Sequence, residues 1–300
     1  MSSNPFDAGH LVGHVKDATY FEVPRAIGGQ KGKLELPQLR PNWHEEPIFT
    51  AKTGFAPIDD IIEPLDLKFT KFMALEVVAA LLICFLFIPL ARRIAGGKVA
   101  KGRLANLLET FCVFIRDEVA VPAIGHDAPK FLPFLWTLFF FVLGCNLLGM
   151  VPWLGSPTGA LATTGALALM TFGAVVIAGM REMGVVGFFK NLVPHMDLPL
   201  PIAVALLPMI FAIEVLGLLI KHFVLAVRLL ANMMAGHLVL AVIVAFIAAA
   251  WQSSAIWAVA PASILGATAL SLLELFVAFL QAYIFTFLSA LFIGSAVHPH

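Results

Sequence analysis

The sequence predicts an all-α polytopic membrane protein with about five membrane-embedded helices and one amphipathic interfacial helix. Composition is the first reason: the 300 residues are 60% hydrophobic and only 13% charged, whereas soluble domains carry about 25% charged residues. The second reason is a mean hydropathy of +0.93. The third is a series of apolar runs that approach or exceed the ~20 residues of a membrane-spanning helix. This composition predicts a lipid bilayer around the chain. The formal net charge is zero, so no nucleic-acid partner is implied.

The chain divides into a polar N-terminal head, residues 1–71, and a membrane domain, residues 72–300. The head carries charges of both signs and several prolines, so we expect it to be loosely structured, with at most one short helix. It contains no apolar run of the secretory-signal type. We therefore expect the first hydrophobic segment to be retained as a membrane span.

The first three spans are predicted at residues 72–91, 131–151 and 160–180. Basic residues cluster directly after the first span and mark the cytoplasmic side of the membrane; they are Arg92, Arg93, Lys98, Lys101 and Arg103. The head is then outside, and Arg181 and Lys190 return the chain to the cytoplasm after the third span. In residues 104–119 apolar side chains recur at helical spacing with polar side chains between them, which indicates an amphipathic helix at the cytoplasmic face.

The last hundred residues contain two apolar stretches, roughly 199–248 and 256–297, each far longer than a perpendicular span. Fifty helical residues extend ~75 Å, against a hydrocarbon core of ~30 Å. Each stretch is therefore either strongly tilted or broken at its prolines and glycines. Residues 251–257 place a tryptophan at each end of a small polar patch, which is typical of a turn at the membrane surface. We expect the C-terminus in the cytoplasm and the chain in a bacterial plasma (inner) membrane.

Four charged side chains interrupt the apolar residues after position 200: Glu214, Lys221, Arg228 and Glu274. Each costs ~2.5–3.5 kcal/mol at mid-membrane on insertion scales, so such groups usually face a bundle interior or an aqueous path. The first three are seven residues apart and therefore share one helix face, and Asn232 extends this stripe. For Glu214 and Lys221, a structural ion pair that holds two helices together is the alternative explanation.

An antiparallel hairpin of the two long stretches brings further polar residues to common depths. Residues at one depth have a constant sum of residue numbers, which is 509 for Arg228 with Gln281 and 511 for His237 with Glu274. Half of ~510 falls in the middle of the tryptophan-flanked turn, as equal helical rise in both arms requires. The hairpin thus predicts arginine beside glutamine and histidine beside glutamate. The same register puts Glu214 level with residues 298–300.

These groups suit the movement of protons. Histidine titrates near physiological pH and a carboxylate can relay protons, so His237 with Glu274 predicts a proton relay; a simple hydrogen bond is the alternative. Arg228 does not lose its proton in a protein, so it is a permanent charge that can hold a passing carboxylate ionised. Small residues around it allow close approach of a partner helix. Because the nearest acid on its stripe is Glu214, a partner subunit with a carboxylate is implied.

The segment RLLANMMAGH, residues 228–237, resembles the signature of subunit a of F-type ATP synthases, the membrane stator that lets protons drive the rotor ring. The resemblance covers about residues 72–297 and includes LELFVAFLQAYIFTFL and CNLLGMVP. It implies two steeply tilted helices against the ring and a proton-translocating function without covalent catalysis, cofactor or metal. The implied partners are the rotor-ring subunit c, the peripheral-stalk subunit b and the remainder of the ATP synthase.

The resemblance also implies roles for single residues. Arg228 matches the essential arginine that faces the rotor carboxylate and separates two aqueous half-channels. Asn232 and Gln281 match its polar neighbours. His237 and Glu274 match the pair that lines the outer half-channel, in an order similar to the mitochondrial type.

Three further positions complete this comparison. Glu214 matches a polar position of the cytoplasmic half-channel, and Lys221 stands where the family carries a polar residue. Gly149 stands where some members carry an acid, so we expect no proton-path role there.

Two other classes of function have different sequence requirements. A secondary ion-coupled transporter also keeps buried charges near the midplane, but it is typically built from internal repeats, and this sequence shows none. An intramembrane enzyme requires a motif such as HExxH or GxSxG, and neither is present. The choice between H⁺ and Na⁺ is expected to lie largely in the rotor subunit.

Overall fold

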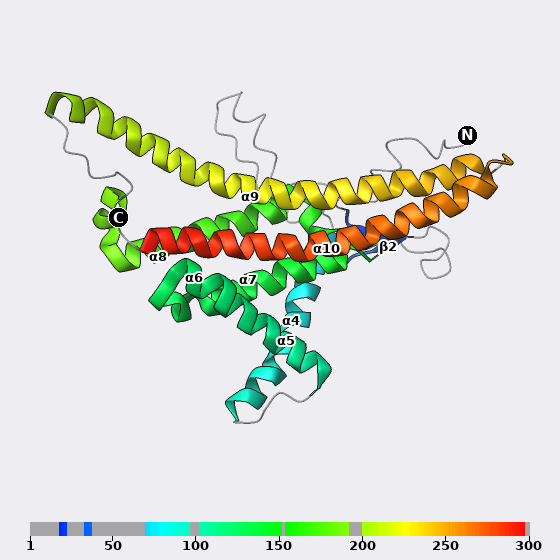
Figure 1. The fold of residues 1–300 in the computed structure, drawn as a ribbon, viewed down its shortest axis with the longest axis horizontal. Helices are drawn as coiled ribbons and strands as arrows, with labels where there is room; N and C mark the ends of the chain where they lie inside the picture. Colours follow the sequence, from blue (N-terminus) through cyan, green and yellow to red (C-terminus); the bar gives the residue numbers. More distant parts are fainter. Residues whose placement is uncertain are drawn as a thin grey trace.

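The computed structural model describes residues 18–22, 33–37, 70–96, 102–151, 154–191, 200–251 and 253–297. These residues form a bundle of helices with one small β-hairpin (Figure 1). Five helical stretches within these ranges are long and apolar enough to cross a membrane. The predicted all-α class of polytopic membrane protein is therefore confirmed.

The described secondary structure consists of two strands followed by a series of helices. The strands are β1 (Tyr20–Glu22) and β2 (Lys33–Glu35). The helices are α4 (Lys71–Ala95), α5 (Arg103–Phe114), the π-helix η2 (Ile115–Ala120), α6 (Val121–Ile124), the 3₁₀-helix η3 (Gly125–Asp127), α7 (Ala128–Gly149), the 3₁₀-helix η4 (Pro157–Gly159), α8 (Leu161–Asn191), α9 (Leu200–Ala250) and α10 (Ile256–Val297).

The described part of the head is a β-hairpin, which sequence reasoning did not predict. Strands β1 and β2 pair antiparallel with Phe21 opposite Leu34. The backbone N–H of Lys71, the first residue of α4, donates to the carbonyl of Ala18 at 2.8 Å. The hairpin is therefore attached to the start of the membrane domain. Three-residue strands give too short an alternation to be recognised from sequence.

Helix α4 begins and ends where its chemistry favours it. The Thr70 hydroxyl accepts from the backbone N–H of Met73 at 3.4 Å, a helix cap, and Arg92 and Arg93 occupy the last turn. Cations there interact favourably with the helix dipole. The chain then continues into α5, and η2, α6 and η3 join α5 to α7 without an extended segment. The position of α5 at the membrane surface stays a prediction.

Helix α8 runs further than the predicted third span and bends near its end. Gly184 has φ 73° and ψ 165°, which breaks the helical geometry between the two parts of α8. Lys130 at the start of α7 pairs with Glu182 just before the bend, at 3.2 Å. The charged ends of α7 and α8 therefore lie together, as expected of two helices that meet the same aqueous side.

Helices α9 and α10 form the predicted antiparallel hairpin, with the turn at residues 251–255. Both are continuous, with Pro208 inside α9 and Pro261 inside α10. The structure therefore decides between the two expectations: the long stretches are not broken. Figure 1 shows the pair leaving the turn together and separating towards the start of α9 and the end of α10.

The core of the bundle lies between α7 and α10. Phe139 and Val142 of α7 are buried, as are Phe285 and Ile293 of α10. Helix α10 also contacts α6, α8 and α9. At Gly294 it approaches α6 so closely that a Cβ there would overlap the carbonyl oxygen of Ala123. The bundle thus supports both arms of the hairpin, α10 through α6, α7 and α8, and α9 through α8 and η4.

Candidate functional site

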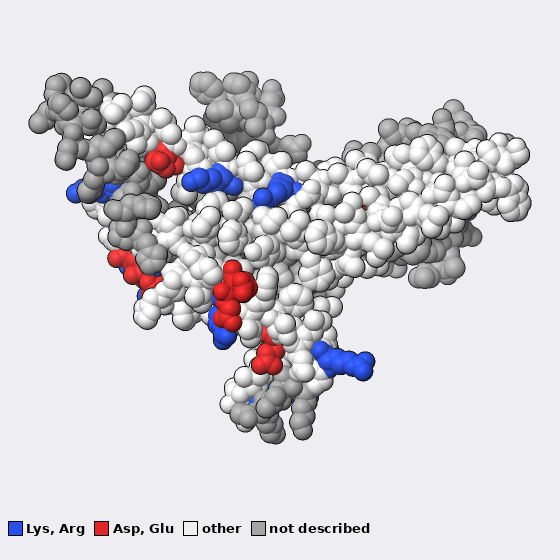
Figure 2. All heavy atoms as spheres, viewed as in Figure 1, with Lys and Arg blue, Asp and Glu red and all other residues white. Residues whose placement is uncertain are grey.

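The polar stripe of α9 lies on the outside of the described molecule. Glu214, Lys221 and Asn232 are exposed, and Arg228 is half-buried. Within the described ranges neither Glu214 nor Lys221 forms an ion pair, so the structural ion-pair explanation is not supported. Figure 2 shows acidic and basic side chains spaced along α9, whereas the end of the hairpin near the turn shows almost none on this face.

Gln281 fixes the level of Arg228, as the hairpin register predicts. The Gln281 side chain is buried, and its Nε2 donates to the backbone carbonyl oxygen of Arg228 at 3.2 Å. The amide therefore holds the backbone of α9 and not the guanidinium group. The predicted register is confirmed at this level, since two residues 53 apart in sequence are in hydrogen-bond contact. The register also puts Glu214 level with residues 298–300, but these lie outside the described residues.

The Arg228 guanidinium has no acidic partner among the residues that the structure describes. Its Nε is buried, and the Nε–H donates to no acceptor among the described residues. A charged group in an apolar environment needs a counter-ion or water. This arrangement makes Arg228 available to a carboxylate from outside the chain.

His237 and Glu274 face each other across the hairpin, which confirms the register at a second level. His237 Nδ1 lies 3.7 Å from Glu274 Oε1, slightly beyond hydrogen-bond distance. On its other side, His237 Nε2 lies 2.9 Å from the carbonyl oxygen of Gly149 in α7. The histidine thus connects α7 to both arms of the hairpin.

The Gly149 contact fixes the tautomer of the neutral histidine. A carbonyl oxygen only accepts hydrogen bonds, so Nε2 must carry the hydrogen. Nδ1 of the neutral ring then has a free lone pair, and it is this atom that faces the Glu274 carboxylate. It has no hydrogen-bond partner among the described residues. The geometry is suited to proton exchange between Glu274 and Nδ1.

Close backbone approach at Gly236 makes room for this pair. A Cβ built on Gly236 would overlap Oε1 of Glu274. The carboxyl group therefore lies directly against the backbone of α9, one residue before His237. Any larger residue would displace it.

Sequence reasoning missed the contribution of α7 and of the connection between α7 and α8. Asn146 is fully buried; its Oδ1 accepts from the Thr158 hydroxyl at 2.8 Å, and its Nδ2 donates to the carbonyl of Ala278 at 3.3 Å. Because Thr158 donates to Asn146, Ser156 must donate to Thr158, at 3.0 Å. An amide inside an otherwise apolar run was the available signal. The role of the Gly149 carbonyl had no side-chain signal.

His222 is a second histidine that the sequence pattern did not single out. It is buried, its Nδ1 lies 2.8 Å from the carbonyl oxygen of Leu218, and its ring contacts Phe172 and Phe292. The two phenylalanines surround it with apolar atoms. We interpret it as a packed core side chain, about 100° around α9 from the stripe.

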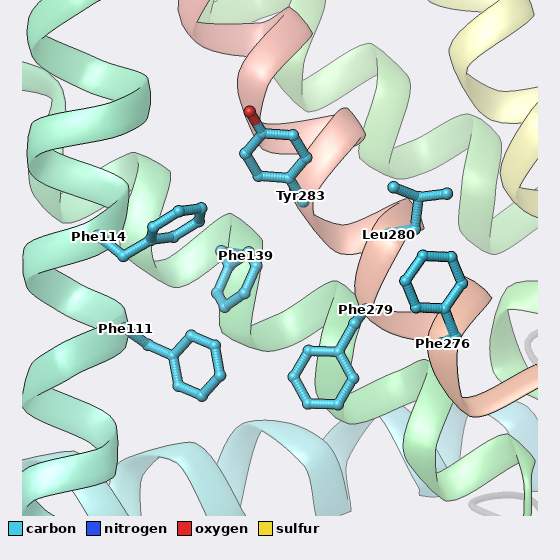
Figure 3. Close-up of a pocket in the computed structure, with 7 residues that line it drawn as sticks. All are labelled: Phe111, Phe114, Phe139, Phe276, Phe279, Leu280 and Tyr283. Atoms are coloured by element: carbon cyan, nitrogen blue, oxygen red, sulfur yellow. The ribbon is translucent and has the colours of Figure 1, made fainter. Parts of the chain in front are cut away.

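An apolar cavity of about 220 Å³ lies between α5, α7 and α10. Figure 3 shows its lining, which consists of Phe111, Phe114, Phe139, Phe276, Phe279, Leu280 and Tyr283. None of these lining side chains carries a charge. Nor do the described residues contain a group of three His, Cys, Asp or Glu side chains that could hold a metal ion.

Comparison with known proteins gives consistent matches over the membrane domain. Residues 73–294 match a family model described as ATP synthase A chain. The chain is 44% identical over 240 residues to ATP synthase subunit a of Myxococcus xanthus (strain DK1622), which covers 79% of this chain and 76% of the relative. It is 39% identical over 235 residues to the subunit a of Chloroherpeton thalassium (strain ATCC 35110 / GB-78), covering 77% and 67%. With that of Anaeromyxobacter sp. (strain Fw109-5) it shares 35% identity over 309 residues, covering 98% and 73%.

Proposed function

Because the chain belongs to the ATP synthase A chain family, whose members are membrane subunits of the ATP synthase complex, we propose that it is the proton-translocating stator. In this role it provides two aqueous half-channels to a rotor-ring carboxylate and an arginine barrier between them. The observation that carries the proposal is Arg228, a half-buried permanent cation without an acidic partner among the described residues.

The outer half-channel ends at His237 and Glu274. A proton from outside reaches Glu274. From there it passes to a carboxylate of rotor subunit c, either directly or through the free Nδ1 of His237, and neutralises that carboxylate. A neutral carboxyl group tolerates lipid far better than a carboxylate, so that rotor subunit can leave the interface. The 3.7 Å separation of the two side chains supports this exchange.

The proton leaves near the start of α9. After nearly a full turn of the ring, the rotor carboxyl approaches Arg228 from the other side, and the cation favours its ionised form. The released proton passes Lys221 and the exposed Glu214 towards the cytoplasm. Arg228 also repels protons that would cross directly, because it carries a charge of the same sign.

The proposal includes the surroundings of the subunit. The exposed stripe of α9 faces rotor subunit c, and subunit b of the peripheral stalk holds the bundle still. The membrane is a bacterial plasma membrane, with the head outside and the C-terminus in the cytoplasm. The basic residues in the last turns of α4 and α8 support this orientation.

Arg228→Ala and Arg228→Lys test the proposal in membrane vesicles that contain the whole ATP synthase. We expect Arg228→Ala to abolish ATP-driven acidification of the vesicles, measured with a pH-sensitive dye, because neither the barrier nor the ion partner remains. Arg228→Lys keeps the charge but not the shape of the guanidinium, so it should keep the barrier to passive leak better than alanine does. Phe223→Leu, an exposed apolar change on the same helix, is the control. Normal pumping by Arg228→Ala would refute the proposal.

A further inference from the structure

Glu76 is an acid in the membrane domain that the proposed pathway does not use. It lies in the second turn of α4, within an otherwise apolar run, and is half-buried. The Thr163 hydroxyl of α8 donates to its Oε1 at 2.7 Å. Within the described ranges no lysine, arginine or histidine forms an ion pair with it. A carboxyl group is costly in such a place, so its retention calls for a function.

Buried polar groups gather around the start of α8, the helix whose Thr163 donates to Glu76. Thr163 and Thr164 at the start of α8 are buried, and so are Ser156, Thr158 and Asn146. The short helix η4, which contains Thr158, packs against α4, α7, α8 and α9. Helix η4 therefore contacts both α4, the helix of Glu76, and α9, the helix of His237.

The polar groups continue from η4 to His237. The side chain of Ser156 lies against Gly149, where a Cβ would overlap its hydroxyl. The carbonyl of Gly149 holds His237 Nε2 at 2.9 Å. Contacts thus connect Ser156 through Gly149 to His237, and η4 also packs against α4, the helix of Glu76. Buried polar sites of this kind are the places where bridging waters bind.

We propose that Glu76 is the outermost carboxylate of the proton inlet, upstream of Glu274 and His237. The carboxylate takes a proton from outside water and becomes a carboxylic acid. It then releases the proton to water beside the Ser156–Thr158–Asn146 groups and returns to the carboxylate form. Thr163 orients the acceptor oxygen. The inference rests on the proposed function and adds a residue from α4 to a pathway otherwise confined to α9 and α10.

A structural bond between α4 and α8 is the competing explanation, and two substitutions separate it from proton transfer. Glu76→Gln keeps an oxygen that accepts from Thr163 but cannot be protonated and deprotonated. Glu76→Asp keeps the carboxyl group and weakens the bond geometry. We expect Glu76→Gln to lower passive proton conduction, measured per assembled complex in vesicles stripped of the catalytic sector, and Glu76→Asp to retain more. Conduction that is normal in Glu76→Gln would overturn the inference, and so would equal loss in both variants.

Two further measurements keep the inference testable if Glu76→Gln assembles poorly. Thr163→Val removes the hydrogen bond and leaves the carboxyl, so conduction should fall less than in Glu76→Gln; an equal fall would favour the structural bond. In Glu76→Cys, a charged thiol reagent added from outside should modify the new thiol, as mapped by mass spectrometry, because water reaches it. An unmodified thiol, with Trp251→Cys in the exposed turn modified as the positive control, would contradict the inference.

ATP-driven pumping by Arg228→Ala, measured in vesicles that keep the whole ATP synthase, distinguishes the two proposals. If Arg228→Ala abolishes pumping while Glu76→Gln conducts normally, the stator function stands and the role of Glu76 is wrong. If both variants behave like the wild type, the proposed function itself fails.

Discussion

At the scale of single residues, the site depends on backbone groups as much as on its charged side chains. The Gly149 carbonyl sets the tautomer of His237, and the Arg228 carbonyl receives the amide of Gln281. Gly236 gives the Glu274 carboxyl its place against α9. The first two contacts leave Nδ1 of the histidine and Nε of the arginine without a hydrogen-bond partner among the described residues.

Gly236→Ala should impair proton transfer without a large loss of stability. The added methyl group overlaps the flexible end of Glu274, which can move away from it, and the His237–Glu274 separation then changes. We expect lower passive proton conduction and a nearly unchanged Tm of the assembled complex. Gly217→Ala on the same helix meets no atom within 4 Å and is the matched control. Equal conduction in the two variants would argue against the positioning of Glu274 by Gly236.

Much of the site could be predicted from residue numbers alone, because two continuous antiparallel helices have equal rise. The predicted Arg228–Gln281 and His237–Glu274 levels both occur in the structure. The Gly149 and Asn146 contacts could not be predicted, because they depend on how α7 packs against the hairpin. Helical periodicity says which face a residue occupies but not which neighbouring backbone it meets.

At the scale of elements, hydropathy predicted most helix boundaries, and the bend within α8 occurs at a glycine. The bend of α8 is at Gly184, whose φ of 73° and ψ of 165° lie in a region essentially restricted to glycine. The prolines inside α9 and α10 do not break these helices. Sequence reasoning left tilt and breakage open because proline permits both, and packing along α10 decides between them.

Gly294→Ala should destabilise the bundle where α10 crosses α6. The new methyl group would overlap the backbone carbonyl of Ala123, and backbone cannot move aside as a side chain can. Overpacking of this kind costs ~1–3 kcal/mol, so we expect a lower Tm of the purified complex. Gly165→Ala in α8, with no atom within 4 Å, is the control and should be neutral or slightly stabilising. Equal Tm values would show that α6 and α10 can separate without cost.

At the scale of the whole molecule, one long side of the hairpin has no partner in the described chain. Helices α8 and α10 cover one side of α9, whereas its stripe and apolar residues such as Ile220 and Phe223 are exposed. Lipid suits the apolar part of this face but not Lys221 and Arg228. A membrane-embedded partner with an acid at the depth of Arg228 would suit both the apolar part of this face and its cations.

A photoreactive residue at position 232 should therefore cross-link to the rotor subunit in the intact complex. Asn232 is exposed on the stripe, four residues from Arg228, so the reactive group would lie at the proposed interface. The same group at position 85 of α4, where Phe85 is 78% exposed, should give lipid or other adducts but none with the rotor. Mass spectrometry of the adducts identifies the partner. Rotor adducts from position 85 but not from position 232 would show that the ring lies against α4 and would contradict the proposed interface at α9.

The uninterrupted length of α9 has a consequence for direction. Glu214 and His237 are 23 residues apart in one unbroken helix, or ~34 Å along its axis. A helix of ~75 Å fits a ~30 Å hydrocarbon core only when it is steeply inclined, so much of that separation is sideways, in the plane of the membrane. In the proposed function, the two openings are therefore neighbours around a circumference, not stacked through the membrane. A proton cannot pass between them by moving straight through; its carrier has to travel around, and the slope of a single helix converts a gradient across the membrane into rotation within it.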